Sequence, residues 1–130
     1  MLKGRAALEA ALASARRGRG ANKYHVAPRE ERTADGIVFA SKAEARRYQD
    51  LKLLRSAGHV RFFLRQVPFH LPGGTRYLLD FLVFWTDGHQ SFEDVKGTRT
   101  EVYELKRRQV AELYGVEIEE LGVRRRTPRR

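Results

Sequence analysis

Two aspartates lie on neighbouring segments that have the character of β-strands. Asp80 stands in the middle of the run 77–85, which is otherwise apolar on both faces. A polar group buried in such a strand costs roughly 2–7 kcal/mol unless it is paired, so Asp80 needs a partner or a metal ion. Asp94 and Lys96 follow in the run 90–96, where alternate residues share one face of a strand. Two carboxylates and a lysine are the residue types of a metal site with a cationic neighbour.

The segment between the two runs predicts how they pair. Thr86–His89 contains an Asp-Gly pair, a strong short-range signal for a β-hairpin. In an ordinary hairpin register, Asp80, Asp94 and Lys96 converge on one face of the sheet. The sequence therefore predicts a metal site on this face. A buried Asp–Lys salt bridge without catalysis is the alternative, although such pairs are weak evidence of stability.

Glu93 leaves the identity of the second carboxylate open. By strand alternation it points to the face opposite Lys96, which favours Asp94 as the acidic partner of the lysine. Glu93 then has a surface or supporting role. A β-bulge between Ser91 and Asp94 would reverse the two assignments.

The charge of the chain predicts its partner. The chain has 26 lysines and arginines against 16 acidic residues, a net charge of +10 and an isoelectric point near 10.5. Such a basic excess is typical of proteins that bind polyanions, most often nucleic acid. The 130 residues, 42% of them hydrophobic, suffice for one compact domain with a real core.

Several classes of function are excluded by residues and motifs that the sequence lacks. The absence of cysteine excludes disulfides, zinc–thiolate sites and thiol nucleophiles. The four histidines have no metal-ligand spacing, and without a phosphate-binding or dinucleotide glycine motif we expect no nucleotide cofactor. No apolar run reaches the length of a membrane span and the N-terminus lacks a secretory signal, so we expect a cytoplasmic protein without a membrane partner.

The composition divides the chain into three parts. Residues 1–23 read as an Ala-rich helix with a basic linker, 24–121 as the globular core, and 122–130 as a basic tail that is disordered on its own. The linker is either a solvated tether or an arm that lies on phosphates, and both interpretations stay open. The candidate DNA-binding cations are Arg16, Arg17, Arg19, Lys42, Arg99, Lys106, Arg107, Arg124, Arg125 and Arg126.

Within the core, hydrophobic periodicity predicts the order helix, three strands, helix, strand. This order is typical of an α/β fold with a mixed β-sheet flanked by helices. The expected helices cover 41–57 and 101–114, and the expected strands cover 77–85, 90–96 and 116–121. Residues 59–71 are expected to form either a strand pair or one long bent strand. The second helix is expected to bury a stripe of Val102, Leu105, Val110 and Leu113.

Glu44 has two interpretations at the start of the first helix. Ser41 is a favourable N-cap and Glu44 is at the N3 position, so the pair reads as a capping box. In the first interpretation the Glu44 carboxylate only satisfies the Ser41 backbone amide. In the second it belongs to the metal site.

The motifs taken together resemble the PD-(D/E)XK nuclease superfamily, with small phage nucleases and archaeal-type Holliday-junction resolvases as the most similar branches. The resemblance covers about residues 24–121, and Leu79 stands where the motif's proline would precede Asp80. It implies a restriction-endonuclease-like core. The matching segments, in chain order, are Ser41-Lys42-Ala43-Glu44, Gln66, Asp80 and Glu93-Asp94-Val95-Lys96-Gly97.

The resemblance implies a Mg²⁺-dependent endonuclease that hydrolyses DNA phosphodiester bonds, with Mn²⁺ as the alternative metal. In this family pattern Asp80 and Asp94 are metal ligands, and the Val95 carbonyl is a third. Glu44 would hold a second metal directly or through water. Lys96 would orient or deprotonate the attacking water. Gln66 matches the position of a glutamine that hydrogen-bonds a metal-bound water or a phosphate.

The resemblance also implies partners. Junction resolution needs two coordinated nicks, so we expect branched DNA as substrate and a homodimer formed through the apolar outer-strand residues or the N-terminal helix. Recombination, repair or phage DNA processing in the host cytoplasm are the expected settings. The alternatives are a non-catalytic basic DNA-binding module and a subunit of a recombination or packaging complex.

Overall fold

The structure is a computed structural model that describes Glu9, residues 26–95 and residues 99–122. The expected N-terminal helix, apart from Glu9, and the basic tail from residue 123 lie outside the described residues. The chain divides into two compact units, residues 1–60 and residues 61–130, and each is described by itself.

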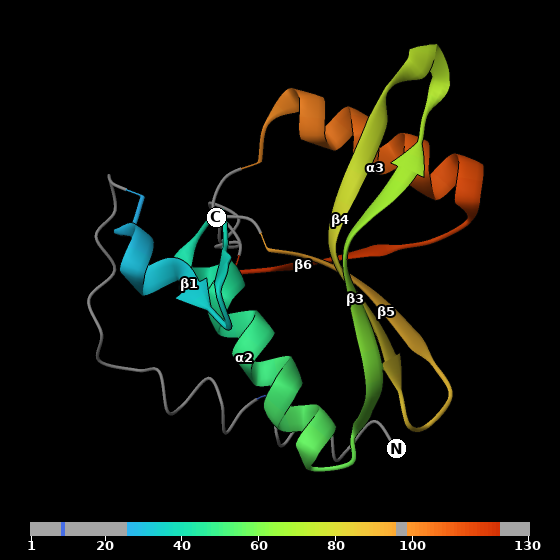
Figure 1. Ribbon diagram of the computed structural model, residues 1–130. Coiled ribbons are helices and arrows are strands. Elements are labelled where there is room, and N and C mark those ends of the chain that lie inside the picture. The colour runs from blue at the N-terminus through green and yellow to red at the C-terminus, as the bar shows by residue number, and fades with distance from the viewer. Residues whose placement is uncertain (1–8, 10–25, 96–98, 123–130) are drawn as a thin grey trace, which may run out of the picture. The chain divides into compact units, whose positions relative to one another are not determined.

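The first unit contains a short hairpin and one long helix (Figure 1). The hairpin turns at Asp35 and Gly36, whose φ angles of 51° and 76° are those of a tight hairpin turn. The helix begins after Ser41, whose hydroxyl accepts a hydrogen bond from the Glu44 backbone N–H at 3.1 Å. This confirms the expected N-cap and the first helix. The elements are η1 (Arg29–Arg32), β1 (Thr33–Ala34), β2 (Ile37–Val38) and α2 (Lys42–Ser56).

The second unit contains a four-stranded sheet in the order β3-β4-β5-β6, together with the helix α3 (Figure 1). The pair β4–β5 is antiparallel and the pair β5–β6 is parallel, so the sheet is mixed. The α/β class, the mixed sheet and the order helix, three strands, helix, strand are therefore confirmed. The elements are β3 (Val60–His70), η2 (Pro72–Gly74), β4 (Arg76–Trp85), β5 (Gln90–Val95), α3 (Glu101–Tyr114) and β6 (Ile118–Leu121).

The hairpin between β4 and β5 forms where the Asp-Gly pair predicts it. Gly88 has a φ of 97°, and its N–H donates to the Trp85 carbonyl at 3.1 Å. The Asp87 carboxylate accepts from the His89 backbone N–H at 3.1 Å, which closes the turn. Local turn chemistry therefore sets the register of the two strands that carry the aspartates.

The core of the second unit joins the β3–β4 hairpin to α3 and β6. Burying a large apolar side chain in this core stabilises the fold by about 1.5–3 kcal/mol relative to leaving it exposed. Tyr114 at the end of α3 fastens the helix to β3, because its hydroxyl donates to the His70 carbonyl at 2.8 Å. The buried set is Phe69, Leu71, Tyr77, Leu79, Tyr103, Val110 and Ile118.

The predicted buried stripe of α3 is wrong in three of its four residues. Val110 is buried, with Tyr103 on the same side, whereas Val102, Leu105 and Leu113 are exposed. The helix has apolar residues on more than one face, so periodicity did not identify the buried one. Contacts made by Tyr103 and Tyr114 with the β3–β4 hairpin set its rotation. None of the helices in the described residues has the length and apolar character needed to span a bilayer.

Candidate carboxylate site

The strand register places acidic residues on three adjacent strands. In the β4–β5 pair Phe81 faces Glu93, and the next residues along the two strands are Asp80 and Asp94. In the parallel β5–β6 pair Asp94 lies beside Glu120. Asp80, Asp94 and Glu120 therefore occupy neighbouring positions across β4, β5 and β6.

Asp80 has a hydrogen-bond partner on each carboxylate oxygen. Its Oδ2 accepts from the Val95 backbone N–H at 2.9 Å, and its Oδ1 accepts from the Gln66 side-chain amide at 3.3 Å. The side chain thus holds the end of β5 beyond the last paired residues of the two strands. These bonds supply the partners that Asp80 was expected to need.

Gln66 has an unusual backbone conformation. Its φ of 51° lies in the left-handed region, which residues other than glycine seldom adopt. Such a conformation costs on the order of 1–3 kcal/mol and is typical of sites where function constrains the chain. Because the Gln66 amide donates to Asp80, the strained residue and the candidate site coincide.

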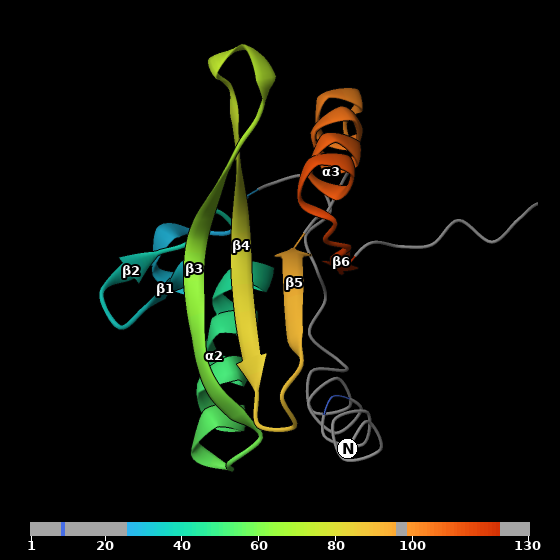
Figure 2. The same cartoon turned by 90° about the vertical axis from the view of Figure 1, so that its right-hand side faces the viewer.

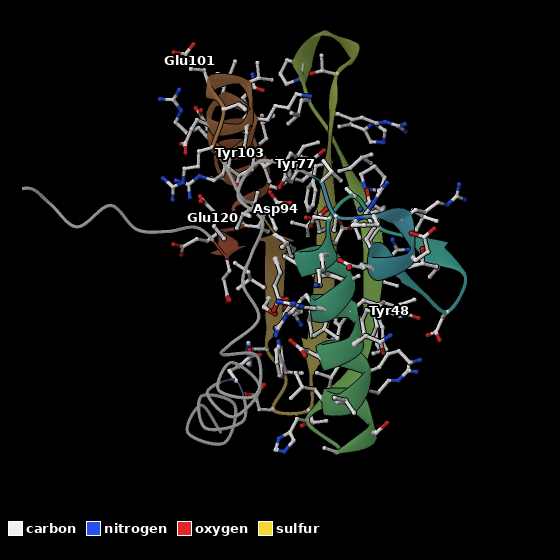
Figure 3. All side chains as sticks on the ribbon, turned by 90° about the vertical axis from the view of Figure 1, so that its left-hand side faces the viewer. Tyr48, Tyr77, Asp94, Glu101, Tyr103 and Glu120 are labelled. Carbon is white, nitrogen blue, oxygen red and sulfur yellow. The ribbon has the colours of Figure 1, made fainter. Side chains whose placement is uncertain are left out.

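Asp94 is enclosed by the aromatic residues of β4 and α3. It is 1% exposed, and Figure 3 shows it grouped with Tyr77, Tyr103 and Glu120. Burial, followed by the charge of Asp94, raises the pKa of both tyrosine hydroxyls well above their ordinary value, because a phenolate beside a carboxylate is disfavoured. Asp80 adds to the effect on the pKa of Tyr77, so this tyrosine lies near both aspartates.

Glu120 holds two arginines. Its Oε2 is 2.6 Å from Arg99 Nε, and its Oε1 is 3.1 Å from Arg107 Nη1. Hydrogen bonding to Glu120 raises the pKa of Arg99 and so keeps the guanidinium charged. Arg99 also lies 3.3 Å from a carboxylate oxygen of Glu104 in α3. The network anchors the start of α3 to β6 beside Asp94.

Glu93 belongs to a separate buried network. It is fully buried, and its Oε2 accepts from the Ser91 hydroxyl at 3.0 Å. Ser91 in turn accepts from the Trp85 indole N–H at 2.8 Å. Glu93, which faces Phe81, and Asp94 are consecutive residues of β5, so their side chains start on opposite faces of the strand. This arrangement favours Asp94 over Glu93 as the carboxylate that accompanies Asp80.

Some predicted site residues are not joined to this cluster. Lys96 lies outside the described residues, as do the candidate DNA-binding cations of the two chain ends. Glu44 belongs to the first unit, where its backbone N–H is capped by Ser41. The metal-binding roles of Glu44 and of the Val95 carbonyl stay predictions. The cations outside the described residues are Arg16, Arg17, Arg19, Arg124, Arg125 and Arg126.

The described candidate DNA-binding residues all have polar partners. Lys42 lies 3.5 Å from Glu31, and Lys106 donates to the Arg76 carbonyl at 3.3 Å. Arg99 and Arg107 are held by Glu120. Arg107 also lines a hollow of about 430 Å³ between the end of α3 and the start of β6, together with Arg108.

Sequence reasoning missed Tyr77, Tyr103 and Glu120 as neighbours of the carboxylates. Tyr77 and Tyr103 read as ordinary apolar strand and helix residues. Glu120 is one of several glutamates in a short alternating run, and its position beside Asp94 depends on the register of a parallel pair connected through α3. Spacing along the chain carries no signal for that register.

The donor chemistry of the site suits a hard cation. Within residues 26–95 and 99–122, no group of three or more histidine or acidic side chains is close enough to hold a metal ion. Mg²⁺ ordinarily uses one or two carboxylates and takes its other ligands from water and substrate phosphates. Asp80 and Asp94 fit such an ion, which would bind together with a phosphate rather than in a preformed cage.

Comparison with known proteins identifies the family but no activity. Residues 22–121 match the family described as a protein of unknown function, DUF1064, so the chain belongs to this family. Neither the curated proteins nor the solved structures contain a detectable match.

Proposed function

We propose that this member of the DUF1064 family is a Mg²⁺-dependent endonuclease that hydrolyses DNA phosphodiester bonds. The observation that carries the proposal is the register of β4 and β5, in which Asp80 and Asp94 are the residues next to the facing pair Phe81 and Glu93. The Cβ atoms of residues at such positions lie about 5 Å apart. Two carboxylate charges at that separation would repel by about 3 kcal/mol at an effective dielectric constant of 20. A bound divalent cation would offset this repulsion and would explain why two carboxylates occupy neighbouring positions.

The proposed chemistry assigns a task to each described residue. Asp80 and Asp94 would hold the cation, and Gln66 and the Val95 N–H keep the Asp80 carboxylate in one orientation. A bound Mg²⁺ supplies a water of lowered pKa and a clamp on the phosphate oxygens. Asp94 is 1% exposed, so little bulk water screens its electrostatic attraction for a cation.

Two further residues enter the proposal from the sequence resemblance alone. Lys96 would orient or deprotonate the attacking water, and Glu44 would complete the metal site. On the same basis we propose that the helices and mixed sheet form a restriction-endonuclease-like core. Junction DNA is the narrower proposal for the substrate, within a recombination, repair or phage DNA-processing pathway.

The proposed DNA partner is supported by charge. The net charge of +10 provides long-range attraction for a polyanion. Near the carboxylates, Glu120 holds Arg99 and Arg107 in fixed positions while leaving each guanidinium with further N–H donors. Arg107 and Arg108 line the hollow beside β6, where a phosphate group of the backbone could be accommodated.

The test is cleavage of an end-labelled four-way DNA junction and of its matched linear duplex, each in Mg²⁺ and in EDTA. We expect Mg²⁺-dependent nicking that Asp80→Asn and Asp94→Asn each reduce at least 100-fold. Asp87→Asn is the matched control, because Asp87 is an exposed turn residue that pairs with His89 and should leave cleavage unchanged.

The outcomes separate the proposals from one another. Paired symmetric nicks on the junction alone would support a resolvase, whereas equal cutting of both DNAs would retain the nuclease and discard junction specificity. DNA binding that is tight, independent of metal and without cleavage would refute the enzyme and leave a non-catalytic DNA-binding module.

A further inference from the structure

An apolar stripe runs along the outer side of α3. Val102 is 63% exposed, Leu105 is 51% exposed and Leu113 is 56% exposed. Val102, Leu105, Gln109 and Leu113 are separated by three, four and four residues in turn, so they lie on one continuous face of the α-helix. The buried face of the helix carries Tyr103 and Val110 instead. Figure 2 shows one long side of α3 turned away from β4 and β5.

The charges that border this stripe are balanced. Two acidic residues, Glu101 and Glu112, and two basic residues, Lys106 and Arg108, lie on the exposed parts of α3 or at the border of the stripe. The stripe is therefore neutral although the whole chain carries +10. DNA and acidic membranes both select surfaces with excess cations, so neither suits this face. An apolar face with balanced borders suits another amphipathic helix.

We propose that this face binds the same face of a second copy of the chain, with the two α3 helices antiparallel and the two-fold axis at Gln109. An axis at Gln109 places Leu105 against the partner's Leu113, and Leu113 against the partner's Leu105, because the two leucines lie four residues on either side of it. Each leucine that is exposed in one chain is thereby covered by its counterpart.

The border charges support a two-fold contact of this kind. Arg108 and Glu112 lie on the same border of the stripe, one turn apart. A two-fold axis perpendicular to both helices brings each border of the stripe next to the same border of the partner. Arg108 therefore faces the partner's Glu112, and the two residues are offset by about 3 Å along the helix axis. The pair occurs twice by symmetry. Gln109 meets the partner's Gln109 on the axis, where two amides can hydrogen-bond and fix the register, as single polar residues do in coiled coils.

The size of the stripe determines how strong the dimer should be. Four turns of one helix bury less than the roughly 800 Å² per partner of a standard interface. We therefore expect a reversible dimer with a dissociation constant on the order of micromolar. The seam is distinct from the outer-strand residues and the N-terminal helix that the sequence suggested as dimer surfaces.

The first experiment is sedimentation equilibrium of the full chain from about 1 to 500 µM, without DNA or Mg²⁺, so that its result is independent of the proposed nuclease activity. The mass should rise from 15.0 kDa for one chain toward twice that value, 30.0 kDa. Leu105→Glu should weaken the dimer at least 100-fold. Leu64→Glu, at a 46% exposed apolar position on β3, is the matched control and should leave it intact. Circular dichroism confirms that each variant is folded.

Two further variants test the geometry itself. Arg108→Glu and Glu112→Arg should each weaken the dimer, and the double variant should restore it, because the exchanged charges then face each other again. The chain has no cysteine, so Gln109→Cys introduces a single thiol that should cross-link to a dimer under mild oxidation. A wild-type chain that stays monomeric at 500 µM, dissociation by Leu64→Glu but not by Leu105→Glu, or failure of the double charge exchange to restore the dimer would each overturn the proposal.

Discussion

Replacing Gln66 tests the strained backbone and the candidate site separately. Gln66→Ala and Gln66→Gly both remove the amide that donates to Asp80, and the two variants differ only in the Cβ atom. At a φ of 51° a Cβ atom costs about 1–2 kcal/mol, because it approaches the neighbouring carbonyl oxygen. The greater freedom of glycine in the unfolded chain removes about 0.5–1 kcal/mol of that difference. The Gly variant should therefore be more stable than the Ala variant by about 1 kcal/mol.

Urea unfolding measures the difference in stability directly, and a difference of 1 kcal/mol corresponds to about 4 °C in Tm for a chain of this size. Both variants should show the same reduced rate in the DNA cleavage assay, since both lose the hydrogen bond to Asp80. Equal stability of the two variants, or a more stable Ala variant, would refute the left-handed conformation of Gln66. If both variants cleaved DNA at the wild-type rate, a role for the Gln66 amide in the site would be refuted.

Two other predictions follow from the buried polar groups. Ser91→Ala removes the hydroxyl between Trp85 and Glu93 and should reduce the free energy of unfolding by about 1–3 kcal/mol in urea, because two buried groups lose a partner; unchanged stability would contradict the network. Folding raises the pKa of Tyr77 above its ordinary value of 10.0. The buried, protonated hydroxyl therefore contributes its full stabilisation below about pH 10, and this stabilisation is lost as the pH rises above 10, because the unfolded chain ionises first. Between pH 9 and pH 11, the free energy of unfolding in urea should therefore fall less for Tyr77→Phe than for the wild type. An equal fall in the free energy of unfolding of both proteins would argue against the buried hydroxyl.

Residues close together in the sequence determined the local elements of this protein. The Asp-Gly turn predicted the hairpin that carries Asp80 and Asp94, because a glycine at positive φ closes a tight turn whatever surrounds it. Ser41 predicted the start of α2, because an N-cap needs only the backbone N–H groups of the next turn. The neighbouring positions of Asp80 and Asp94 on β4 and β5 followed from that hairpin and from strand alternation.

The sequence also identified Asp80 as a residue that needs partners, but it did not identify them. The partners are Gln66 on the preceding strand and the Val95 N–H on the following one. Gln66 was singled out through a family resemblance, whereas its left-handed backbone is a property of the folded strand. A glutamine gives no local signal for that conformation, since it carries none of the freedom that marks glycine.

Tertiary structure alone decided which face of α3 is buried and which residues surround Asp94. Periodicity showed that α3 is a helix with apolar residues, yet those residues cover more than one face, and contacts with the β3–β4 hairpin selected Tyr103 and Val110. The register of the parallel pair β5–β6 brought Glu120 beside Asp94. A parallel connection passes through a whole helix, so its register is set by packing between distant segments and leaves no mark in the spacing of residues along the chain.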